Sequence, residues 1–146
     1  MVEINFEDID EVPGLNSEFL FSWYTQVCSV ESKVLGDVTL IFCSDDYLLE
    51  MNQTHLNHDY YTDIITFDYS DDNIVSGDLF ISYDRVVDNA ASFSSSVKDE
   101  LHRVCVHGLL HLCGYKDKSD SDEQLMRLKE DEMLKLRVFH VEHLKS

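Results

Sequence analysis

The segment 101–113 constrains the fold more than any other part of this chain. Its residues, LHRVCVHGLLHLC, are apolar at almost every position. The polar exceptions are His102, Arg103, His107 and His111. A helix with so little polar surface is stable when protein covers it on most sides. Gly114 follows at the place where many helices end in a left-handed residue. We therefore expect a buried helix at the centre of the molecule.

The spacing of apolar residues predicts the other elements, because it is near two in a strand and near 3.6 in a helix. Strands are expected at 2–6, 37–44, 62–70 and 77–82, the last two as paired neighbours. Helices are expected at 15–30, from 45, at 83–93, at 96–113 and from Ser119 or Ser121 onward. Asp45 and Asp46 are the candidate caps of the second helix. No repeat or linker divides the chain, so residues 1–146 are expected to form a single domain.

The cysteines and the first residues indicate the compartment. No stretch approaches the ~18 to 20 consecutive apolar residues of a membrane span. The first ten residues, MVEINFEDID, are acidic where a secretory signal is basic. Four cysteines form no CxxC pair and lie in apolar runs, where cysteine behaves as a small hydrophobic residue: Cys28, Cys43, Cys105 and Cys113. We therefore expect a cytoplasmic protein with reduced thiols and no membrane contact.

Charge is distributed unevenly along the chain, whose net charge is −18. Residues 1–84 hold one basic residue against 18 acidic ones, whereas the rest hold 10 basic and 11 acidic residues. A field of this sign repels phosphate backbones, so any nucleic-acid contact must be local. The candidate surface is in the C-terminal half, which contains Arg103, Lys116, Lys118, Arg127 and Lys129.

Two histidines in the buried segment have the spacing of metal ligands. His107 and His111 are four residues apart, so on a helix their side chains share one face. The helix stop at Gly114 lets the chain turn back, and Asp117 can then offer a carboxylate to the same ion. Paired histidines also occur as hydrogen-bonded core residues, and Asp117 lies in a charged loop, so spacing alone leaves both interpretations open. Cys113 precedes the glycine on another helix face, which favours a buried thiol.

These residues bring a known family into view. The stretch HGLLHLCGYKD, at 107–117, closely resembles the HGxLHLxGYDH signature of the YbeY family, bacterial zinc-dependent endoribonucleases involved in ribosomal RNA maturation. The segment MNQTHLNHDYYTDIITFDY, at 51–69, resembles the family's LNxxYRxxDxxTDVLSFP segment. GDLFIS at 77–82 and SDEQLMRLKEDEML at 121–134 resemble its next strand and its closing helix. The resemblance covers about two-thirds of the chain in the family's order.

The resemblance implies a fold and a metal. The expected fold is α+β, with about four strands in a mostly antiparallel or mixed sheet, a central zincin-like metal-binding helix and the C-terminal helix over it. His107, His111 and Asp117 would hold Zn²⁺, with Asp117 where the family has a third histidine. A carboxylate makes the site harder, which admits Mn²⁺ or Co²⁺ more readily. The implied function is single-strand RNA cleavage in ribosomal RNA maturation or ribosome quality control, with ribosomal RNA and ribosomal proteins as partners.

The chain departs from the family at a second position. The family has an arginine after an aromatic residue where this chain has His55 followed by Leu56. A guanidinium can clamp a phosphate or stabilise a transition state, and leucine can do neither. Candidate replacements are Arg85, Arg103 and Lys116. The general acid or base is not assigned.

Four residues in the segment around Leu56 have two possible roles, at the surface or in the site. Thr62 and Asp63 match positions at the head of a strand, where they either cap a turn or contact substrate. His55 and His58 are expected to be surface groups.

Two alternatives belong to other functional classes. A ribosome-associated binding module with a structural metal would explain both the missing arginine and the acidic surface. A zinc peptidase is suggested by the pattern HExxHxxGxxH, but Gly108 stands where such enzymes carry their catalytic glutamate. The peptidase is therefore the weaker alternative.

Overall fold

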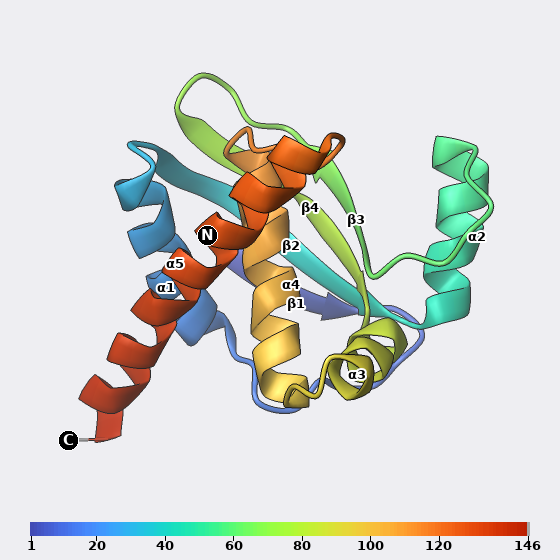
Figure 1. Cartoon of the computed structure of the whole chain (residues 1–146), viewed down its shortest axis with the longest axis horizontal. Coiled ribbons are helices and arrows are strands. Elements are labelled where there is room, and N and C mark those ends of the chain that lie inside the picture. The colour runs from blue at the N-terminus through green and yellow to red at the C-terminus, as the bar shows by residue number, and fades with distance from the viewer. Residues whose placement is uncertain (146) are drawn as a thin grey trace.

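The computed structural model describes residues 1–145, with the backbone alone for residues 138–145. Its elements in chain order are β1 (Val2–Phe6), α1 (Ser17–Val30), β2 (Val34–Cys43), α2 (Asp45–Leu56), β3 (Ile64–Asp68), β4 (Ile74–Ser82), α3 (Tyr83–Ser92), α4 (Val97–Leu112) and α5 (Asp120–Lys145) (Figure 1). Each predicted strand and helix is present. The expected α+β class is confirmed.

The four strands form one mixed sheet in the order β1-β2-β4-β3. β1 pairs with β2 in parallel, with Val2 opposite Val38, and β2 also pairs with β4 in parallel. β3 and β4 are antiparallel neighbours, with Ile64 opposite Ile81. The expectation of a mixed sheet is confirmed, but a mostly antiparallel one is wrong. The reason is connectivity: α1 links β1 to β2, and a crossover helix lets consecutive strands run parallel.

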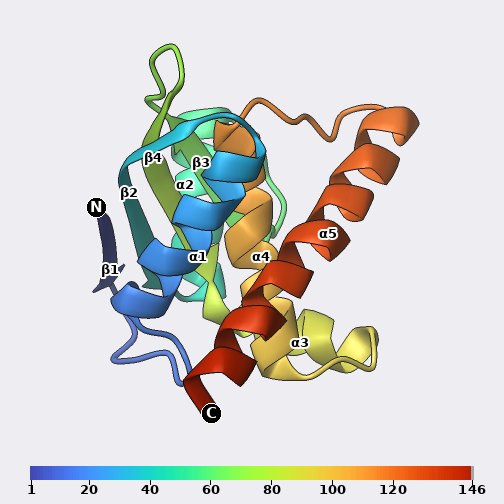
Figure 2. The same cartoon turned by 90° about the vertical axis from the view of Figure 1, so that its left-hand side faces the viewer.

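Helix α4 lies at the centre of the main core, against β3 and β4 (Figure 1). Its packing on the sheet is close at Gly108, where an added Cβ would lie 2.8 Å from Cδ1 of Ile64 and 2.9 Å from Cδ1 of Leu79. α1 and α5 pack on the same core, as Figure 2 shows. Tyr24 of α1 donates its hydroxyl hydrogen to the Cys105 carbonyl of α4 at 2.6 Å.

Helix α2 covers part of the opposite face of the sheet. Alternation along β3 places Ile64 in the α4 core and Ile65 in a smaller cluster with Cys43 and Leu48. α2 begins after Ser44, whose hydroxyl accepts from the Tyr47 amide at 3.1 Å. The prediction that Asp45 or Asp46 caps the helix is therefore wrong. Ser44 is the cap, and both aspartates lie in the first turn of the helix, where negative charge is favourable.

The way in which α4 ends sets the direction of the following loop. Gly114 has φ +108°, in the left-handed region that favours glycine. Its amide donates to the His111 carbonyl at 3.0 Å, and the Tyr115 amide donates to the Leu110 carbonyl at 3.1 Å. This paired arrangement is a Schellman motif, which reverses the chain direction after a helix. The loop then leads to α5, where the Ser119 hydroxyl accepts from the Asp122 amide at 3.1 Å.

Three of the four cysteines are buried as expected, whereas Cys113, expected to be a buried thiol, is not. All four thiols are free; Cys28, Cys43 and Cys105 are buried, and Cys113 is half-buried. Among the residues described, we find no helix that combines the length and apolar character needed to cross a bilayer.

Candidate metal centre

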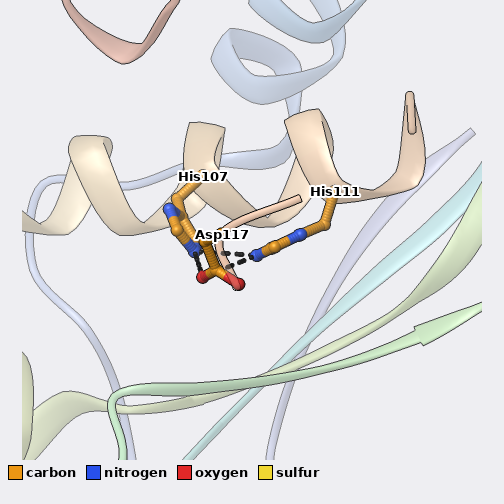
Figure 3. A group of neighbouring side chains, drawn as sticks. All are labelled: His107, His111 and Asp117. Carbon is orange, nitrogen blue, oxygen red and sulfur yellow. Dashed lines mark hydrogen bonds and ion pairs between the residues drawn. The ribbon is translucent and has the colours of Figure 1, made fainter. Parts of the chain in front are cut away.

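Two histidines of α4 and an aspartate from the next loop converge on one point (Figure 3). The imidazoles of His107 and His111 have centroids 4.5 Å apart and an interplanar angle of 83°. Their Nε2 atoms are 3.0 Å apart. Oδ2 of Asp117 lies 3.5 Å from Nε2 of His107 and 3.3 Å from Nε2 of His111. The structure therefore brings together all three residues that the sequence singled out.

The second nitrogen of each ring determines where its hydrogen lies. Nδ1 of His111 is 2.9 Å from the Tyr115 carbonyl oxygen, which can only accept. Nδ1 of His107 is 2.6 Å from Oε2 of Glu130, which accepts when the carboxylate is ionised. Both Nδ1 atoms therefore donate. In the neutral imidazoles, each Nε2 then carries a lone pair and no hydrogen.

When both imidazoles are neutral, three acceptor atoms thus face one another without a hydrogen between them. Two imidazole lone pairs and a carboxylate oxygen repel at this range unless a proton or a cation lies among them. A tetrahedral ion with ligands at about 2.0 to 2.1 Å separates its donor atoms by about 3.3 Å. The distances of 3.0, 3.3 and 3.5 Å are close to that value. The donor set fits a divalent cation both in chemistry and in spacing.

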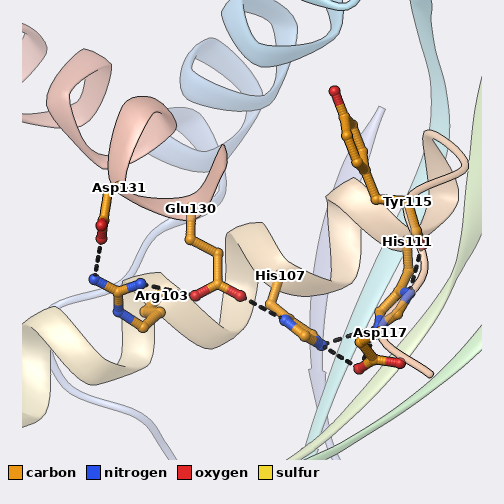
Figure 4. A network of polar contacts seen from close by, with 7 residues as sticks. All are labelled: Arg103, His107, His111, Tyr115, Asp117, Glu130 and Asp131. Atoms are coloured by element: carbon orange, nitrogen blue, oxygen red, sulfur yellow. Dashed lines mark hydrogen bonds and ion pairs between the residues drawn. The ribbon is translucent and has the colours of Figure 1, made fainter. Parts of the chain in front are cut away.

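Glu130 of α5 holds His107 and is itself held by Arg103 (Figure 4). The Glu130 side chain is only 7% exposed, and Nη1 of Arg103 donates to its Oε1 at 2.7 Å. Nη2 of Arg103 donates to Asp131 at 2.6 Å. Burial raises the pKa of the Glu130 carboxyl, but the hydrogen bonds from His107 and Arg103 outweigh it and lower that pKa below its ordinary value. The carboxylate is therefore ionised and orients the ring.

The surroundings of His107 favour positive charge on its ring. Burial lowers the pKa of His107, but the hydrogen bond to Glu130 and the nearby charges of Glu130, Asp63 and Asp117 raise it above its ordinary value. The same negative charges attract a cation at Nε2, which competes with a proton for the lone pair. Sequence reasoning missed Glu130, because its position depends on how α5 packs on α4 and no spacing in the chain signals it.

All three residues line one cavity, and two of them, His107 and Asp117, also line a second. The second, which we call the α5 cavity, has a volume of about 930 Å³ and lies between α4 and the first half of α5. The first, the loop cavity, has a volume of about 690 Å³ and lies between β3 and the loop at 57–63. Asp63, His107 and Asp117 line both. Both volumes are typical of ligand sites.

The structure separates the three candidate replacements for the family arginine. Arg85 pairs with Asp45 at 2.6 Å and lines neither cavity. Lys116 also lines neither cavity. Arg103 lines the α5 cavity, but its guanidinium is occupied by two carboxylates. Of the three, Arg103 alone reaches the site, and it acts on the site through Glu130.

Two cations that were not proposed as replacements do line the cavities. Arg127 lies on the wall of the α5 cavity, and Lys118 on that of the loop cavity. Both are exposed. Among the described residues, neither makes an ion pair. They are the cations best placed to meet a phosphate near the three converging side chains.

Leu56 lines the loop cavity and is 41% exposed, so the family's arginine position does face the metal centre. His58 and Thr62 line the same cavity, whereas His55 does not. Both histidines are exposed, as expected. Asp63 is half-buried between the two cavities, and desolvation raises the pKa of its carboxyl.

The position of Gly108 weighs against peptidase chemistry. Its Cα faces the sheet, where a side chain would meet Ile64 and Leu79 at less than ordinary contact distance. A side chain at this position would require Ile64 and Leu79 to move. The glutamate that acts as general base in HExxH peptidases is absent, and the packing disfavours its introduction.

Known proteins resemble this chain over nearly its whole length. The family model described as Endoribonuclease YbeY matches residues 3–137. A protein named Endoribonuclease YbeY from Flavobacterium psychrophilum is 52% identical over 139 residues, which cover 95% of this chain and 94% of that protein. A protein of the same name from Porphyromonas gingivalis is 48% identical, over 92% of this chain and 89% of that protein.

A solved structure shares the fold. The solution structure of a protein from Thermotoga maritima superposes with a TM-score of 0.67 at 25% identity. The match covers 98% of this chain and 93% of the Thermotoga protein.

Proposed function

The chain belongs to the YbeY endoribonuclease family, and from this premise we propose that it is a metal-dependent endoribonuclease that cleaves single-stranded RNA during ribosomal RNA maturation or ribosome quality control. The observation that carries the proposal is the convergence of two imidazole lone pairs and a carboxylate oxygen at 3.0 to 3.5 Å, on the wall of two cavities. We assign His107, His111 and Asp117 as the metal ligands.

We assign Zn²⁺ as the metal, with Mn²⁺ or Co²⁺ as alternatives. Two imidazoles and one carboxylate are a common zinc donor set. The carboxylate of Asp117 is a harder ligand than a third imidazole and adds negative charge, which favours Mn²⁺ and Co²⁺ relative to an all-histidine site. When bound, the ion supplies Lewis-acid polarisation of a phosphoryl oxygen.

The chain's own residues orient this chemistry. Glu130 and the Tyr115 carbonyl each accept an Nδ1 hydrogen and so keep both Nε2 lone pairs aimed at the same point. Arg127 and Lys118 offer positive charge on either side of it. RNA carries a 2′-hydroxyl that can act as an internal nucleophile, so cleavage needs less acid and base machinery than peptide hydrolysis does.

The charge of the chain limits where RNA can bind. Since the chain carries −18 overall, its contact with RNA is confined to the two cavities, and acidic surfaces elsewhere suit basic ribosomal proteins. We propose the ribosome as partner, the cytoplasm as compartment, and residues 1–146 as a single functional domain.

The test combines metal content with cleavage. Protein purified without an affinity tag is analysed by mass spectrometry, and cleavage of a structured ribosomal RNA fragment is measured with added Zn²⁺ or Mn²⁺. We expect close to one equivalent of metal in the wild type, and loss of both metal and cleavage in His107→Ala and His111→Ala. His55→Ala removes an exposed histidine that lines neither cavity and should change neither. Cleavage that persists in His111→Ala indicates a contaminating nuclease.

A binding module with a structural metal is the second candidate, and Leu56 favours it. This residue places an alkyl group where the family has a guanidinium, in the cavity that the ligands line. A module predicts full metal loading and ribosome association without RNA cleavage. The two candidates therefore differ in one measurement, the turnover of RNA by metal-loaded protein.

A further inference from the structure

The loop between α2 and β3 presents two stacked rings beside the metal centre. The rings of His58 and Tyr60 have centroids 5.2 Å apart and an interplanar angle of 22°. The Tyr60 hydroxyl and Nδ1 of His58 are 2.9 Å apart and hydrogen-bonded. Both residues line the loop cavity together with His107, His111 and Asp117. The function proposed above gives this ring pair no role.

The pair is held rigidly by α2. Asn57 ends that helix in the left-handed conformation, at φ 57°. Asn52, only 2% exposed, then fixes the loop at two points. Its carbonyl accepts from the His58 amide at 3.1 Å, and its Nδ2 donates to the Tyr60 carbonyl at 2.9 Å. A ligand that binds these rings therefore meets a preorganised surface, which lowers the entropy cost of binding.

The Tyr60 side chain is accessible. His58 stacks against its ring, and Tyr60 remains 55% exposed. An exposed aromatic face at the rim of a cavity is suited to a flat partner, because offset stacking gains more than random apolar contact. Leu56 and Ile64 add apolar wall to the same cavity, and Lys118 adds a cation.

We propose that the His58–Tyr60 pair is a stacking site for one nucleobase of single-stranded RNA, that of a nucleotide flanking the phosphate held at the metal centre. This inference rests on the proposed function and adds a subsite to it. RNA presents flat bases joined by phosphates, and the loop cavity offers an aromatic face, an apolar wall, one cation and the metal ligands within one volume. Leucine in place of the family arginine suits a base at this wall better than a phosphate.

Tyr61 provides a matched control next in the chain. It is 49% exposed, close to the exposure of Tyr60, yet it does not line the loop cavity. Its hydroxyl donates to Asp46 at 3.3 Å, and the guanidinium of Arg85 lies 5.2 Å from its ring centroid. Tyr61→Ala therefore removes a ring of the same kind from the same loop without touching the stacking face.

The test pairs protein variants with abasic RNA. Binding of a short fluorescent single-stranded RNA is measured by anisotropy with Zn²⁺-loaded protein, on RNA whose 2′-hydroxyls are methylated so that the internal nucleophile is blocked, and the same RNA is made with an abasic nucleotide at each position in turn. Loss of one stacked base weakens binding by about 5- to 150-fold. We expect this loss in wild type at one position, next to the cleavage site found with metal present. Tyr60→Ala should bind intact RNA with the same loss and be indifferent to the abasic position.

Two further variants complete the comparison. Tyr60→Trp should restore wild-type affinity and sensitivity to the abasic position, and Tyr61→Ala should behave as wild type. Equal affinities of Tyr60→Ala and Tyr61→Ala, or no sensitive position in wild-type protein, would overturn the stacking site. The proposed function fails by a different observation, namely that metal-loaded wild type cleaves no RNA. If Tyr60→Ala binds intact RNA more weakly and is indifferent to the abasic position, while metal-loaded wild type cleaves no RNA, the stacking site stands on a protein that is not a nuclease.

Discussion

Nδ1 of His107 on α4 lies 2.6 Å from Oε2 of Glu130 on α5, so the closing helix orients the first metal-ligand candidate. The substitution Glu130→Gln keeps the shape and removes the charge. We expect it to weaken Zn²⁺ affinity by about 10- to 100-fold, the usual effect of losing a carboxylate behind a ligating histidine. Competition with a chromophoric chelator measures the affinity.

Glu132 supplies the control for that change. It lies two residues along α5, is 54% exposed, and pairs with Lys129 at 3.5 Å. Glu132→Gln should therefore leave Zn²⁺ affinity unchanged. If Glu130→Gln also binds Zn²⁺ as the wild type does, Glu130 does not position the ligand.

The burial of His102 should make the stability of the fold depend on pH. This residue is 1% exposed, and its Nε2 has no hydrogen-bond partner among the described residues. Burial lowers the pKa of His102 to about 4, with help from the charge of Arg137. The unfolded chain, with an ordinary value near 6.5, binds the proton first as the pH falls. Stability should therefore decrease from about pH 6.5 down to about pH 4, by up to about 3 kcal/mol.

Urea unfolding at pH 7 and pH 4.5 checks this expectation. The substitution His102→Gln should flatten the difference, because glutamine does not titrate. His55→Gln, on the surface, should leave it in place. If His102→Gln loses as much stability between pH 7 and pH 4.5 as the wild type does, other groups cause the acid sensitivity.

The sequence predicts the part of the site that is built by a single helix, α4, and by the turn that ends it. The pair His107 and His111 follows from a four-residue spacing, and the return of Asp117 follows from the left-handed turn at Gly114. The orientation of the two rings could not be predicted, since it is set by Glu130 and the Tyr115 carbonyl. Glu130 reaches His107 only because α5 packs on α4.

The fold also has parts that the sequence predicts and parts that it does not. Strand and helix order follows from periodicity, and the pairing of β3 with β4 follows from their closeness in the chain. The parallel pairing of β1 with β2 follows from the helix between them, but the sequence pattern does not show that β4, rather than β3, lies beside β2. Likewise, Lys116 and Lys118 are equivalent in the sequence, and only the course of the loop after Gly114 brings Lys118 to a cavity.

The close packing of Gly108 on the sheet limits which residues α4 tolerates at this position. The substitution Gly108→Glu would introduce the glutamate of HExxH peptidases. We expect it to destabilise the fold by about 3 kcal/mol or more, because the side chain would be forced against Ile64 and Leu79 and its charge would be buried. Thermal unfolding measures the loss, and Gln124→Glu, exposed on α5, is the control that should unfold like wild type. A soluble Gly108→Glu variant with wild-type Tm would show that α4 and the sheet separate easily.

Lys118 and Lys116 allow the electrostatic part of RNA binding to be isolated. Lys118 lines the loop cavity and Lys116 does not, although both are exposed lysines of the same loop. Each phosphate neutralised on a single strand contributes about −0.7 to the slope of log affinity against log salt concentration. We expect Lys118→Ala to make this slope shallower by about 0.7 and to weaken binding similarly for all sequences, whereas Lys116→Ala should match wild type. Titrations of a short single-stranded RNA in EDTA at several salt concentrations give the slopes, and identical slopes for the two variants would place the phosphate contact elsewhere, with Arg127 as the next cation to replace.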